Sequence, residues 1–568
     1  MKIHPILFTL LVLITSCQKK PSAWKGTTLT QNREHLTVTE LLEGTAQSLL
    51  DMSYFTKPDW SKKAKYNFSG SLFFQDTELT FPKEKAYYAG ENIFPTLQLD
   101  FIAYQGELIP SVRKKISTKQ ESSSLWDVVV GTGKTWQEDK DGDWSRASFP
   151  LTLTDRYVGQ ARNCVATFIY QSDSVSPICL QCSQETADIN DRQLGNISGI
   201  LPIVFQPQQF ADSTQIINKN NQLTSERIPV FPLTDIDKKG DIADYFEEMI
   251  YTNAPTSLGA VLLDNKLYLH PPKTRHGLYP YPNDMRHGLY SVTKSMAGAL
   301  ALMYFAERYD ESIFDAQITD YVPALANHEG WQGVTFGHTL NMVTGTVGSD
   351  RLEHFFVPVL SADRAEEAIH NIATLGDAPE APGQKFNYAS ANSFVLSYAL
   401  QQYVMEKEGG NINYWDLVHQ NVLVPIGAEN FSLLYTRDNK SQAIPVLALG
   451  ALPTIDEAAK IARLFANMGS HNGQQLLNPT KVKEVFGQSD WKGHSTNRDY
   501  RGDNYQHAFW SKTIKKGSCT LKATYMLGFG ANYIVFLPSG AIIFRFLDEG
   551  DLNIDELIQY VENVSSSC

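Results

Sequence analysis

The sequence predicts an α+β protein with a strand-rich first part and a mixed second part. In the first part, short apolar runs with alternating or β-branched residues occur at 97–102, 128–130 and 165–170. Turn-forming clusters separate these runs, which is typical of an antiparallel, sandwich-like β domain. In the second part, apolar residues recur at three- and four-residue spacing in 242–251, 296–308, 391–404 and 455–468. This spacing predicts amphipathic helices interleaved with strands.

The composition is that of an ordinary globular chain. Its 568 residues include 49 basic and 62 acidic side chains, which leave a formal charge of −13. A negative balance without a Lys/Arg-rich block argues against a nucleic-acid partner, because phosphate binding needs concentrated positive charge. We expect four segments, at 1–17, 18–59, 60–235 and 236–568. They are a signal peptide, a tether with a helical lead-in, a β-rich domain of unassigned role, and a mixed domain.

The first residues have the features of a targeting segment. Lys2 precedes an apolar run over 6–14, which is about half of the ~20 residues that a spanning helix needs. The run ends in Ile14-Thr15-Ser16-Cys17, which resembles the bacterial lipobox. Lipidation of Cys17 would anchor an exported protein to a membrane, and Gln18 at the next position resembles sorting to the outer membrane, facing the periplasm or the cell surface. An ordinary signal peptide with a chance cysteine is the alternative.

No later stretch reaches 18 apolar residues, and the polar stretch over 206–235, with a proline near each end, is expected to be a linker. The other cysteines are odd in number, so at least one remains unpaired within the chain. A disulfide among Cys164, Cys179 and Cys182 is the simplest reading. The CxxC spacing of Cys179 and Cys182 lacks a second ligand pair for zinc.

Two further motifs in the first part are incomplete. The stretch 131–135 ends like a phosphate loop but has Val128 where a glycine is required. The acidic cluster 139–143 begins like a calcium loop, but its sixth position is Trp144. We interpret the cluster as a hairpin turn, and we expect no metal and no cofactor.

The most informative stretch is Ser291-Val292-Thr293-Lys294, which opens the helix expected over 296–308. If Ser291 begins that helix, Lys294 lies one turn later on the same face. A serine hydroxyl needs a base within hydrogen-bond distance, and a lysine can be that base where burial lowers its pKa. The helix N-terminus would also favour a developing oxyanion. SxxK alone is weak, because a capping serine and a solvated lysine give the same pattern.

Four later segments supply context in a consistent order, namely 318–323, 334–345, 382–390 and 528–538. Together with SxxK they resemble the serine β-lactamase and penicillin-binding-protein superfamily. The similar branch holds class C β-lactamases, D-alanyl-D-alanine carboxypeptidases, esterases and aminohexanoate-oligomer hydrolases. The resemblance covers about 240–565. It implies a β-lactamase/transpeptidase-like fold, with a helical subdomain between Ser291 and the final strands.

The resemblance also implies site residues. Ser291 matches the acylated nucleophile, Lys294 its partner, and Tyr388 the tyrosine of the YxN motif, which shuttles protons. The backbone N–H groups of Ser291 and Phe529 would form the oxyanion hole. Ser390, Gly528 and Tyr290 are the residues expected to bind substrate, and the aromatic residues Tyr281, Trp510 and Tyr525 could line the pocket or simply pack.

Two departures from the family pattern bear on the substrate. Position 390 is Ser rather than Asn, and the last strand reads Tyr525-Met526-Leu527-Gly528 in place of a KTG or HxG triplet. Lys516-Gly517-Ser518 imitates KTG but is interpreted as a hairpin turn. The missing cation favours hydrolysis of an ester or amide bond in a small substrate. A D-alanyl-D-alanine carboxypeptidase or β-lactamase activity, or a non-catalytic surface-binding lipoprotein with a relict domain, is the alternative. The oligomeric state is left open.

Overall fold

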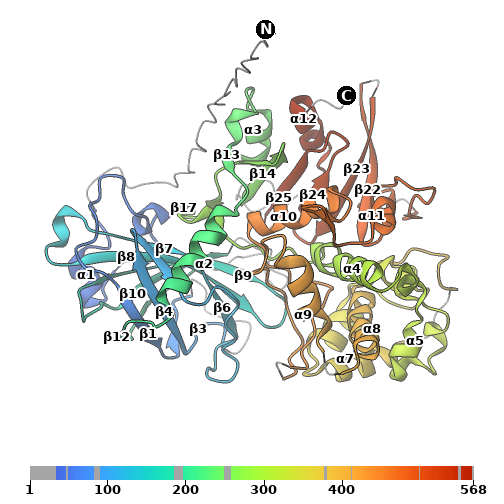
Figure 1. Ribbon diagram of the computed structural model, residues 1–568, viewed down its shortest axis with the longest axis horizontal. Helices are drawn as coiled ribbons and strands as arrows, with labels where there is room; N and C mark the ends of the chain where they lie inside the picture. The colour runs from blue at the N-terminus through green and yellow to red at the C-terminus, as the bar shows by residue number, and fades with distance from the viewer. Residues whose placement is uncertain are drawn as a thin grey trace, which may run out of the picture.

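The computed structural model describes residues 33–46, 49–81, 90–184, 196–247, 257–376, 380–410, 412–439, 441–497, 499–517, 519–547 and 552–565. The expected signal peptide, Cys17 and the polar stretch 18–31 lie outside the described residues. Within the described ranges, no helix combines the length and apolar character needed to cross a membrane. The predicted α+β class is confirmed, and Figure 1 shows the strand-rich part beside the mixed part.

The strand-rich part is built on one ten-stranded sheet in the order β11-β10-β9-β8-β7-β5-β4-β1-β12, with β6 paired to β8. All of its pairings are antiparallel. Its strands are β1 (Ser69–Phe74), β4 (Leu97–Tyr104), β5 (Glu107–Pro110), β6 (Trp126–Val130), β7 (Gly133–Trp136), β8 (Ser145–Asp155), β9 (Ala161–Tyr170), β10 (Ile178–Gln184), β11 (Ile197–Leu201) and β12 (Ile203–Pro207). A separate two-stranded sheet pairs β2 (Thr77–Glu78) with β3 (Ile93–Phe94).

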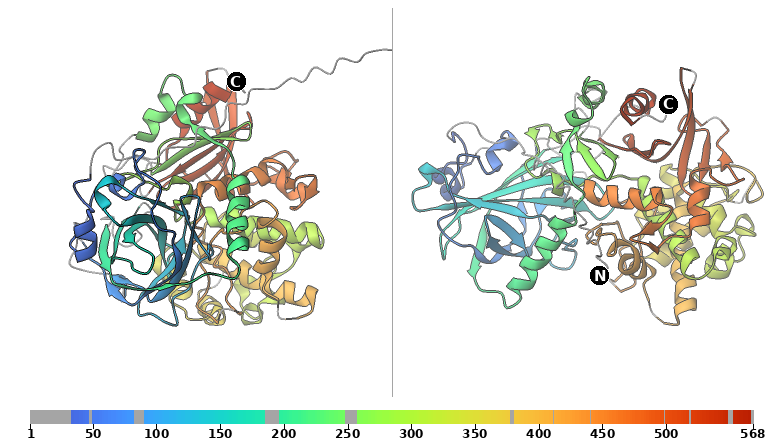
Figure 2. Two further views of the ribbon diagram at one scale, coloured as in Figure 1. Left: turned by 60° about the vertical axis from the view of Figure 1, so that its left-hand side comes forward. Right: turned by 45° about the horizontal axis from the view of Figure 1, so that its top comes forward.

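This sheet curls into a near-barrel, where the sequence suggested two sheets packed as a sandwich (Figure 2, left). The long strand β8 pairs with β7 near its start and with β6 near its end. Two strands therefore follow one another along β8. A bridge between Thr80 and Ser198 brings the segment after β1 to the outer edge of β11. Twist that accumulates over many strands produces this curvature, and alternating apolar residues are common to both architectures.

The disulfide expected among three cysteines is confirmed and joins Cys164 to Cys182. The two residues are directly opposite each other on β9 and β10. Cys179 on the same strand is a buried free thiol, and burial raises its pKa to about 12. A thiol in that state is unreactive, because the thiolate is the nucleophilic form.

A buried ion-pair network fastens the lead-in to the near-barrel. The lead-in contains α1 (Val38–Glu43) and a 3₁₀ turn (Met52–Phe55). The guanidinium of Arg33 donates to Glu138 at 2.7 Å, and that of Arg146 donates to the Leu36 carbonyl at 2.7 Å. Arg146 also pairs with Asp141 at 2.7 Å. The acidic cluster is therefore the turn between β7 and β8, as predicted, and one of its carboxylates neutralises an arginine.

The stretch expected to be a linker contains α2 (Ser213–Ser225). The sequence of this helix shows little amphipathic pattern, because its buried residues are the polar Asn220 and the apolar Leu223. The Asn220 side chain donates to Glu107 on β5 at 3.0 Å. A polar helix can thus be held by side-chain hydrogen bonds to the neighbouring sheet, which composition does not reveal.

The mixed part has a nine-stranded sheet in the order β13-β15-β14-β25-β24-β23-β22-β21-β20. β13 and β15 are parallel, and the other neighbours are antiparallel. Its strands are β13 (Val230–Pro232), β14 (Leu258–Leu263), β15 (Lys266–Leu269), β20 (His494–Ser495), β21 (Asn504–Gln506), β22 (Phe509–Lys516), β23 (Cys519–Gly528), β24 (Asn532–Phe536) and β25 (Ile542–Phe546). The smaller pairs are β16 (Lys273–Thr274) with β17 (Gly277–Leu278), and β18 (Ser470–His471) with β19 (Gln474–Gln475).

Helices flank this sheet and form the predicted helical subdomain between Ser291 and the last strands (Figure 1). They are α3 (Asp241–Glu247), α4 (Leu300–Arg308), α5 (Ile318–Tyr321), α6 (Phe336–Leu340), α7 (Ala365–Ala373), α8 (Ser390–Glu408), α9 (Tyr414–Val418), α10 (Ile455–Ala466), α11 (Pro479–Val485) and α12 (Asp555–Ser565). Three of the helices expected from apolar spacing correspond to α4 with the turn before it, α8 and α10, and α3 covers the described part of the fourth, whose residues 248–251 lie outside the described residues. The mixed part therefore has the layered arrangement that the sequence predicts.

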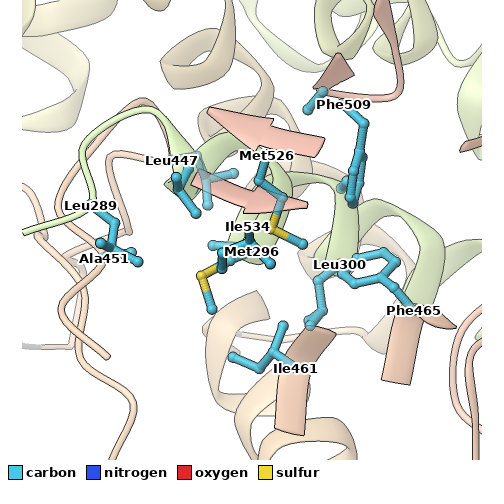
Figure 3. Packing of buried hydrophobic residues seen from close by; sticks show 14 of the residues in the cluster. Leu289, Met296, Leu300, Leu447, Ala451, Ile461, Phe465, Phe509, Met526 and Ile534 are labelled. Atoms are coloured by element: carbon cyan, nitrogen blue, oxygen red, sulfur yellow. The ribbon is translucent and has the colours of Figure 1, made fainter. Parts of the chain in front are cut away.

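The helix that follows Ser291 is packed between the sheet and α10 (Figure 3). Met296 and Leu300 lie with Met526 of β23, Ile534 of β24 and Ile461 of α10 in one apolar cluster. All five side chains are buried. Dense packing of this kind holds side chains in fixed rotamers, so the start of the helix is held firmly against the end of β23.

Candidate active site

Ser291 lies in a turn immediately before the helical segment that leads into α4, as its spacing to Lys294 predicts. Tyr290, the residue before it, is buried and has a φ of 44°. A non-glycine residue in this left-handed region is uncommon and is found where the surrounding structure enforces it. The sharp turn leaves Ser291 partly exposed while its neighbours on both sides are buried.

The amine of Lys294 is held by three oxygen atoms. Its Nζ lies 2.9 Å from Oγ of Ser291, 2.9 Å from Oγ of Ser390 and 2.9 Å from the carbonyl oxygen of Ala448. The residue is 1% exposed. A charged ammonium can donate to all three, whereas a neutral amine can donate to two and accept a proton from the third.

Burial lowers the pKa of Lys294 to about 8. The nearby carboxylate of Asp350 raises this pKa, and the guanidinium of Arg501 lowers it. Loss of hydration destabilises an ammonium more than an amine, which is why burial dominates. With a pKa of about 8, on the order of a tenth of the lysine is neutral at pH 7 and can accept the serine proton.

The loop that precedes α10 supplies the Ala448 carbonyl. This loop is fixed to the nucleophile segment by two hydrogen bonds at its other end. The N–H of Leu289 donates to the Ala451 carbonyl at 3.0 Å, and the N–H of Ala451 donates to Oγ1 of Thr293 at 2.9 Å. Figure 3 shows Leu289 beside Ala451. The residues on either side of Ser291 thus position the group that binds Lys294.

Tyr388 lies next to the lysine, two residues before α8. Nζ of Lys294 is 5.0 Å from the centroid of its ring. Burial raises the pKa of Tyr388 above its ordinary value, and Asp350 raises it further, while hydrogen bonding with Ser291 lowers it. The phenol therefore stays protonated at neutral pH and can act as a hydrogen-bond donor beside the serine.

Ser390, expected to contact substrate, is the first residue of α8 and is 4% exposed. Its hydroxyl accepts from Lys294, and its backbone N–H donates to Oδ1 of Asp350 at 2.8 Å. The position where the family pattern has Asn therefore still presents an oxygen to the lysine. Asp350 caps the start of α8 and places a negative charge near Lys294 and Tyr388.

The residues expected at the oxyanion hole come together with Ser291. A Cβ on Gly528 would lie 2.1 Å from the Leu289 carbonyl oxygen, so only glycine permits this approach of β23 to the nucleophile segment. Phe529 follows, 54% exposed, with its ring 5.5 Å from that of Tyr290. Within the described part of the chain, neither the N–H of Ser291 nor that of Phe529 donates to another loop or side chain.

The aromatic residues that could line the pocket have different positions. The Tyr281 hydroxyl donates to the Ser148 carbonyl of β8 at 2.9 Å, so this ring packs against the near-barrel. Trp510 stacks on Tyr388, with centroids 5.6 Å apart, and so belongs to the site. Lys516 pairs with Cys519 across the β22–β23 hairpin, as the interpretation of this triplet as a hairpin turn predicts, and Ser518 lies outside the described residues.

Sequence reasoning did not identify Asp350, Ala448, Asp499 or Arg501. Ala448 contributes a backbone atom, which leaves no side-chain signal, and the other three lie in loops without a motif. Arg501 follows the helical subdomain, and its guanidinium carbon lies 4.5 Å from the centroid of the Tyr388 ring. Among the described residues, no group of three or more His, Cys, Asp or Glu side chains could hold a metal ion.

Comparison with known proteins gives a family for this part of the chain. Residues 257–502 match the family model described as Beta-lactamase. No functionally curated protein matches the chain. The matched range contains Ser291, Lys294 and Tyr388.

Several solved structures are similar at low sequence identity. A penicillin-binding protein from Bacillus halodurans is 14% identical with a TM-score of 0.40, covering 58% of this chain and 98% of that chain. A D-stereospecific amidohydrolase from Streptomyces sp. is 12% identical with a TM-score of 0.41, covering 58% and 99%. A family VIII carboxylesterase is 15% identical with a TM-score of 0.42, covering 59% and 97%. The family match thus covers residues 257–502, and this part of the chain is similar to the Beta-lactamase family.

Proposed function

We propose that this protein is a serine hydrolase that cleaves an ester or amide bond through an acyl-enzyme on Ser291. The observation that carries the proposal is the 2.9 Å contact between Oγ of Ser291 and the buried amine of Lys294. A nucleophile and a base at hydrogen-bond distance, with the base held by further groups, is the arrangement that covalent catalysis needs.

Acylation begins when the neutral amine of Lys294 accepts the proton of Ser291 as Oγ attacks the substrate carbonyl carbon. The C–O bond forms while the carbonyl π electrons move to the oxygen. Backbone N–H groups of Ser291 and Phe529 stabilise that oxyanion, and donors already in place cost no reorganisation. The lysine is an ammonium at the end of this step, still held by Ser390 and Ala448.

Collapse of the tetrahedral intermediate needs a proton on the leaving atom. Tyr388, protonated because burial raises its pKa, donates that proton and regains one from the Lys294 ammonium. The C–O or C–N bond to the leaving group breaks, and the acyl group remains on Ser291. Water then attacks the ester, giving its proton to the same pair of residues in reverse.

The residue type at one position of β23 supports a proposal for the substrate class. Met526 is fully buried on the strand where the family pattern has a KTG lysine, so this strand presents no cation there. This favours a small ester or amide substrate over β-lactams and D-alanyl-D-alanine termini. The alternatives are a cell-wall activity and a relict domain that binds without catalysis. The test below distinguishes both of them from the proposed hydrolase.

The test is active-site labelling of the purified chain with a fluorophosphonate and, separately, a fluorescent penicillin. We expect the fluorophosphonate to label the protein and Ser291→Ala to abolish labelling. Ser312→Ala, at an exposed position of the same domain, is the control that should label normally. Labelling by penicillin at a comparable rate would favour the cell-wall activity, and no labelling by either probe would favour a relict domain.

For its location, we propose a lipid anchor at Cys17 that holds the folded chain at the outer membrane. The lipobox-like sequence supports this proposal. The membrane would then be a partner through the anchor alone, with the small substrate as the other partner.

A further inference from the structure

The near-barrel reaches the loop that binds Lys294 through the turn between β8 and β9. A Cβ on Gly159, in this turn, would lie 2.7 Å from Cα of Gly450. The backbone of the turn is therefore packed directly against the backbone of the loop. Gly450 is two residues after Ala448, whose carbonyl accepts from Lys294 at 2.9 Å. Only two residues separate the near-barrel contact from a hydrogen-bond partner of the proposed base.

The β8–β9 turn is held in one conformation by its own hydrogen bonds. The carboxylate of Asp155 accepts from the N–H of Tyr157 at 2.8 Å and from that of Val158 at 2.7 Å. It also accepts from the N–H of Gln160 at 2.5 Å. An aspartate that binds the backbone of its own turn fixes that turn. Val158, 5% exposed, extends from the turn into the apolar core of the mixed part.

A second segment, 432–437, packs against the loop beside this contact. A Cβ on Gly450 would lie 2.1 Å from Cβ of Leu434. The N–H of Val446 donates to the Leu434 carbonyl at 3.0 Å. Gly450 is thus packed against both the near-barrel turn and Leu434, which leaves the loop that carries Ala448 little room to move.

The near-barrel also holds this second segment. Lys115, between β5 and β6, donates from Nζ to the Leu433 carbonyl at 2.5 Å. The guanidinium carbon of Arg437 lies 4.8 Å from the ring centroid of Tyr157, which is in the β8–β9 turn. The strand-rich part therefore contacts the Ala448 loop directly and also fixes the segment against which that loop packs.

The Ala448 carbonyl differs from the other two partners of Lys294. A carbonyl oxygen can only accept, whereas the hydroxyls of Ser291 and Ser390 can donate or accept. The carbonyl therefore takes one N–H whether the lysine is charged or neutral. With a second N–H on Ser390, the lone pair of the neutral amine is directed at Ser291. A small displacement of such an orienting group is costly in rate, because the reacting atoms must be aligned.

The charged groups that act on Lys294 all lie in the mixed part. Asp350 raises the pKa of the lysine and Arg501 lowers it. Arg501 is itself paired with Asp499 at 2.6 Å, and Tyr388 is neutral at ordinary pH. A substitution in the near-barrel turn changes none of these charges, so its effect on the lysine must pass through the Ala448 loop.

We propose that the β8–β9 turn of the near-barrel positions the Ala448 carbonyl against Lys294, which makes the strand-rich part a component of the active site. The inference rests on the proposed function, in which Lys294 is the base for Ser291. Gly159 is then a positioning residue, because it acts on the lysine only through the loop. The proposal gives the β-rich domain a role that its sequence left unassigned.

The test measures the rate of fluorophosphonate labelling across a pH range that spans the pKa of Lys294, about 8. Fluoride leaves without a proton, so this rate depends on Ser291 and Lys294 rather than on Tyr388. Gly159→Ala adds a Cβ where the Gly450 backbone lies and should displace the loop. We expect the rate on the high-pH plateau to fall about tenfold or more, because the amine loses its orientation. The midpoint of the pH profile should move to lower pH by about one unit, because the ammonium loses a hydrogen-bond acceptor.

A second variant and a matched control accompany this measurement. Lys115→Met removes the hydrogen bond to the Leu433 carbonyl while keeping an aliphatic side chain, and should move the midpoint less but in the same direction. Gly106→Ala is the control, because Gly106 is also a turn glycine of the near-barrel, with a φ of 82° against 70° at Gly159. Its Cβ would meet only the Thr135 carbonyl oxygen, at 3.8 Å, so both plateau and midpoint should stay as in the wild type. Thermal melting followed by circular dichroism measures the folding of each variant separately.

The inference would be overturned by a folded Gly159→Ala protein whose pH profile equals that of the wild type, or by equal changes in Gly106→Ala. A lower plateau with an unmoved midpoint would also overturn it, since the turn would then support the fold without acting on the lysine. If Gly159→Ala does not fold, an unmoved midpoint in Lys115→Met overturns the inference. All these outcomes leave the proposed function intact, because the wild-type protein is still labelled at Ser291. A wild-type protein that no fluorophosphonate labels would count against the proposed function itself.

Discussion

The side-chain amide of Asn163 makes two hydrogen bonds with the backbone of Arg286, accepting from its N–H at 2.9 Å and donating to its carbonyl at 2.8 Å. Asn163 is fully buried on β9 of the near-barrel, and Arg286 is five residues before Ser291. The Arg286 guanidinium reaches Glu457 of α10 at 3.0 Å and the Leu452 carbonyl at 2.6 Å. The strand-rich part thus holds the segment that ends in the proposed nucleophile.

Our first prediction is that Asn163→Ala destabilises the protein. The substitution leaves a buried N–H and a buried carbonyl of Arg286 unpaired, which costs about 1–3 kcal/mol for each group. Urea unfolding should show a lower midpoint. Asn421→Ala is the control, because its amide donates to the Leu417 carbonyl on an exposed surface. Similar midpoints for the two variants would contradict a coupling between the two parts.

The second prediction concerns Ser291 and Lys294. Ser291→Ala should abolish acylation by a nitrophenyl ester, and Lys294→Ala should lower it about as far, because residues that transfer one proton together are not additive. Stopped-flow release of nitrophenolate measures both rates. A Lys294→Ala variant that retained most of its acylation rate would mean that another base activates the serine.

The third prediction separates the roles of Lys294 and Tyr388. Tyr388→Phe should slow cleavage of an amide more than that of a nitrophenyl ester, because nitrophenolate departs without a proton whereas an amine does not. The comparison is made by steady-state kinetics on an ester and an amide with the same acyl group. Equal losses on both substrates would remove the proton-donor role from Tyr388.

The fourth prediction is a pH dependence. Lys294 must be neutral to accept a proton, and burial lowers its pKa to about 8. The acylation rate should therefore rise about tenfold per pH unit below pH 8 and level off above it. Asp350→Asn removes a negative charge that raises this pKa, so the rising limb should move to lower pH. A limb that stayed in place would exclude Lys294 as the titrating group.

The fifth prediction concerns the anchor. Cys17→Ser should release folded, active protein from the membrane fraction, because the polar stretch 18–31 separates Cys17 from the lead-in that contains α1, and Ser291 is far along the chain. Fractionation and labelling with fluorophosphonate measure both properties. A variant that still sediments with membranes after a high-salt wash would place the anchor elsewhere, and one that unfolds would give the tether a structural role.

The sequence by itself determined the local parts of this protein. Ser291 and Lys294 are three residues apart at the start of one helix, so helical geometry brings them together without help from the rest of the chain. The helices over 296–308 and 455–468, and the hairpin at Lys516, follow in the same way from periodicity and turn residues. Tyr388 could be named because it lies in a motif with a recognisable neighbourhood.

The tertiary structure alone decided what surrounds those residues. Ala448 offers a backbone carbonyl to Lys294, and any residue type could do so. Asp350 and Arg501 reach the site from loops whose positions depend on how distant segments pack. The closure of β1 to β12 into one curled sheet likewise depends on long-range strand pairing, which alternating apolar residues do not specify. Local spacing therefore predicts the reactive pair, while its pKa depends on contacts between residues far apart in the sequence.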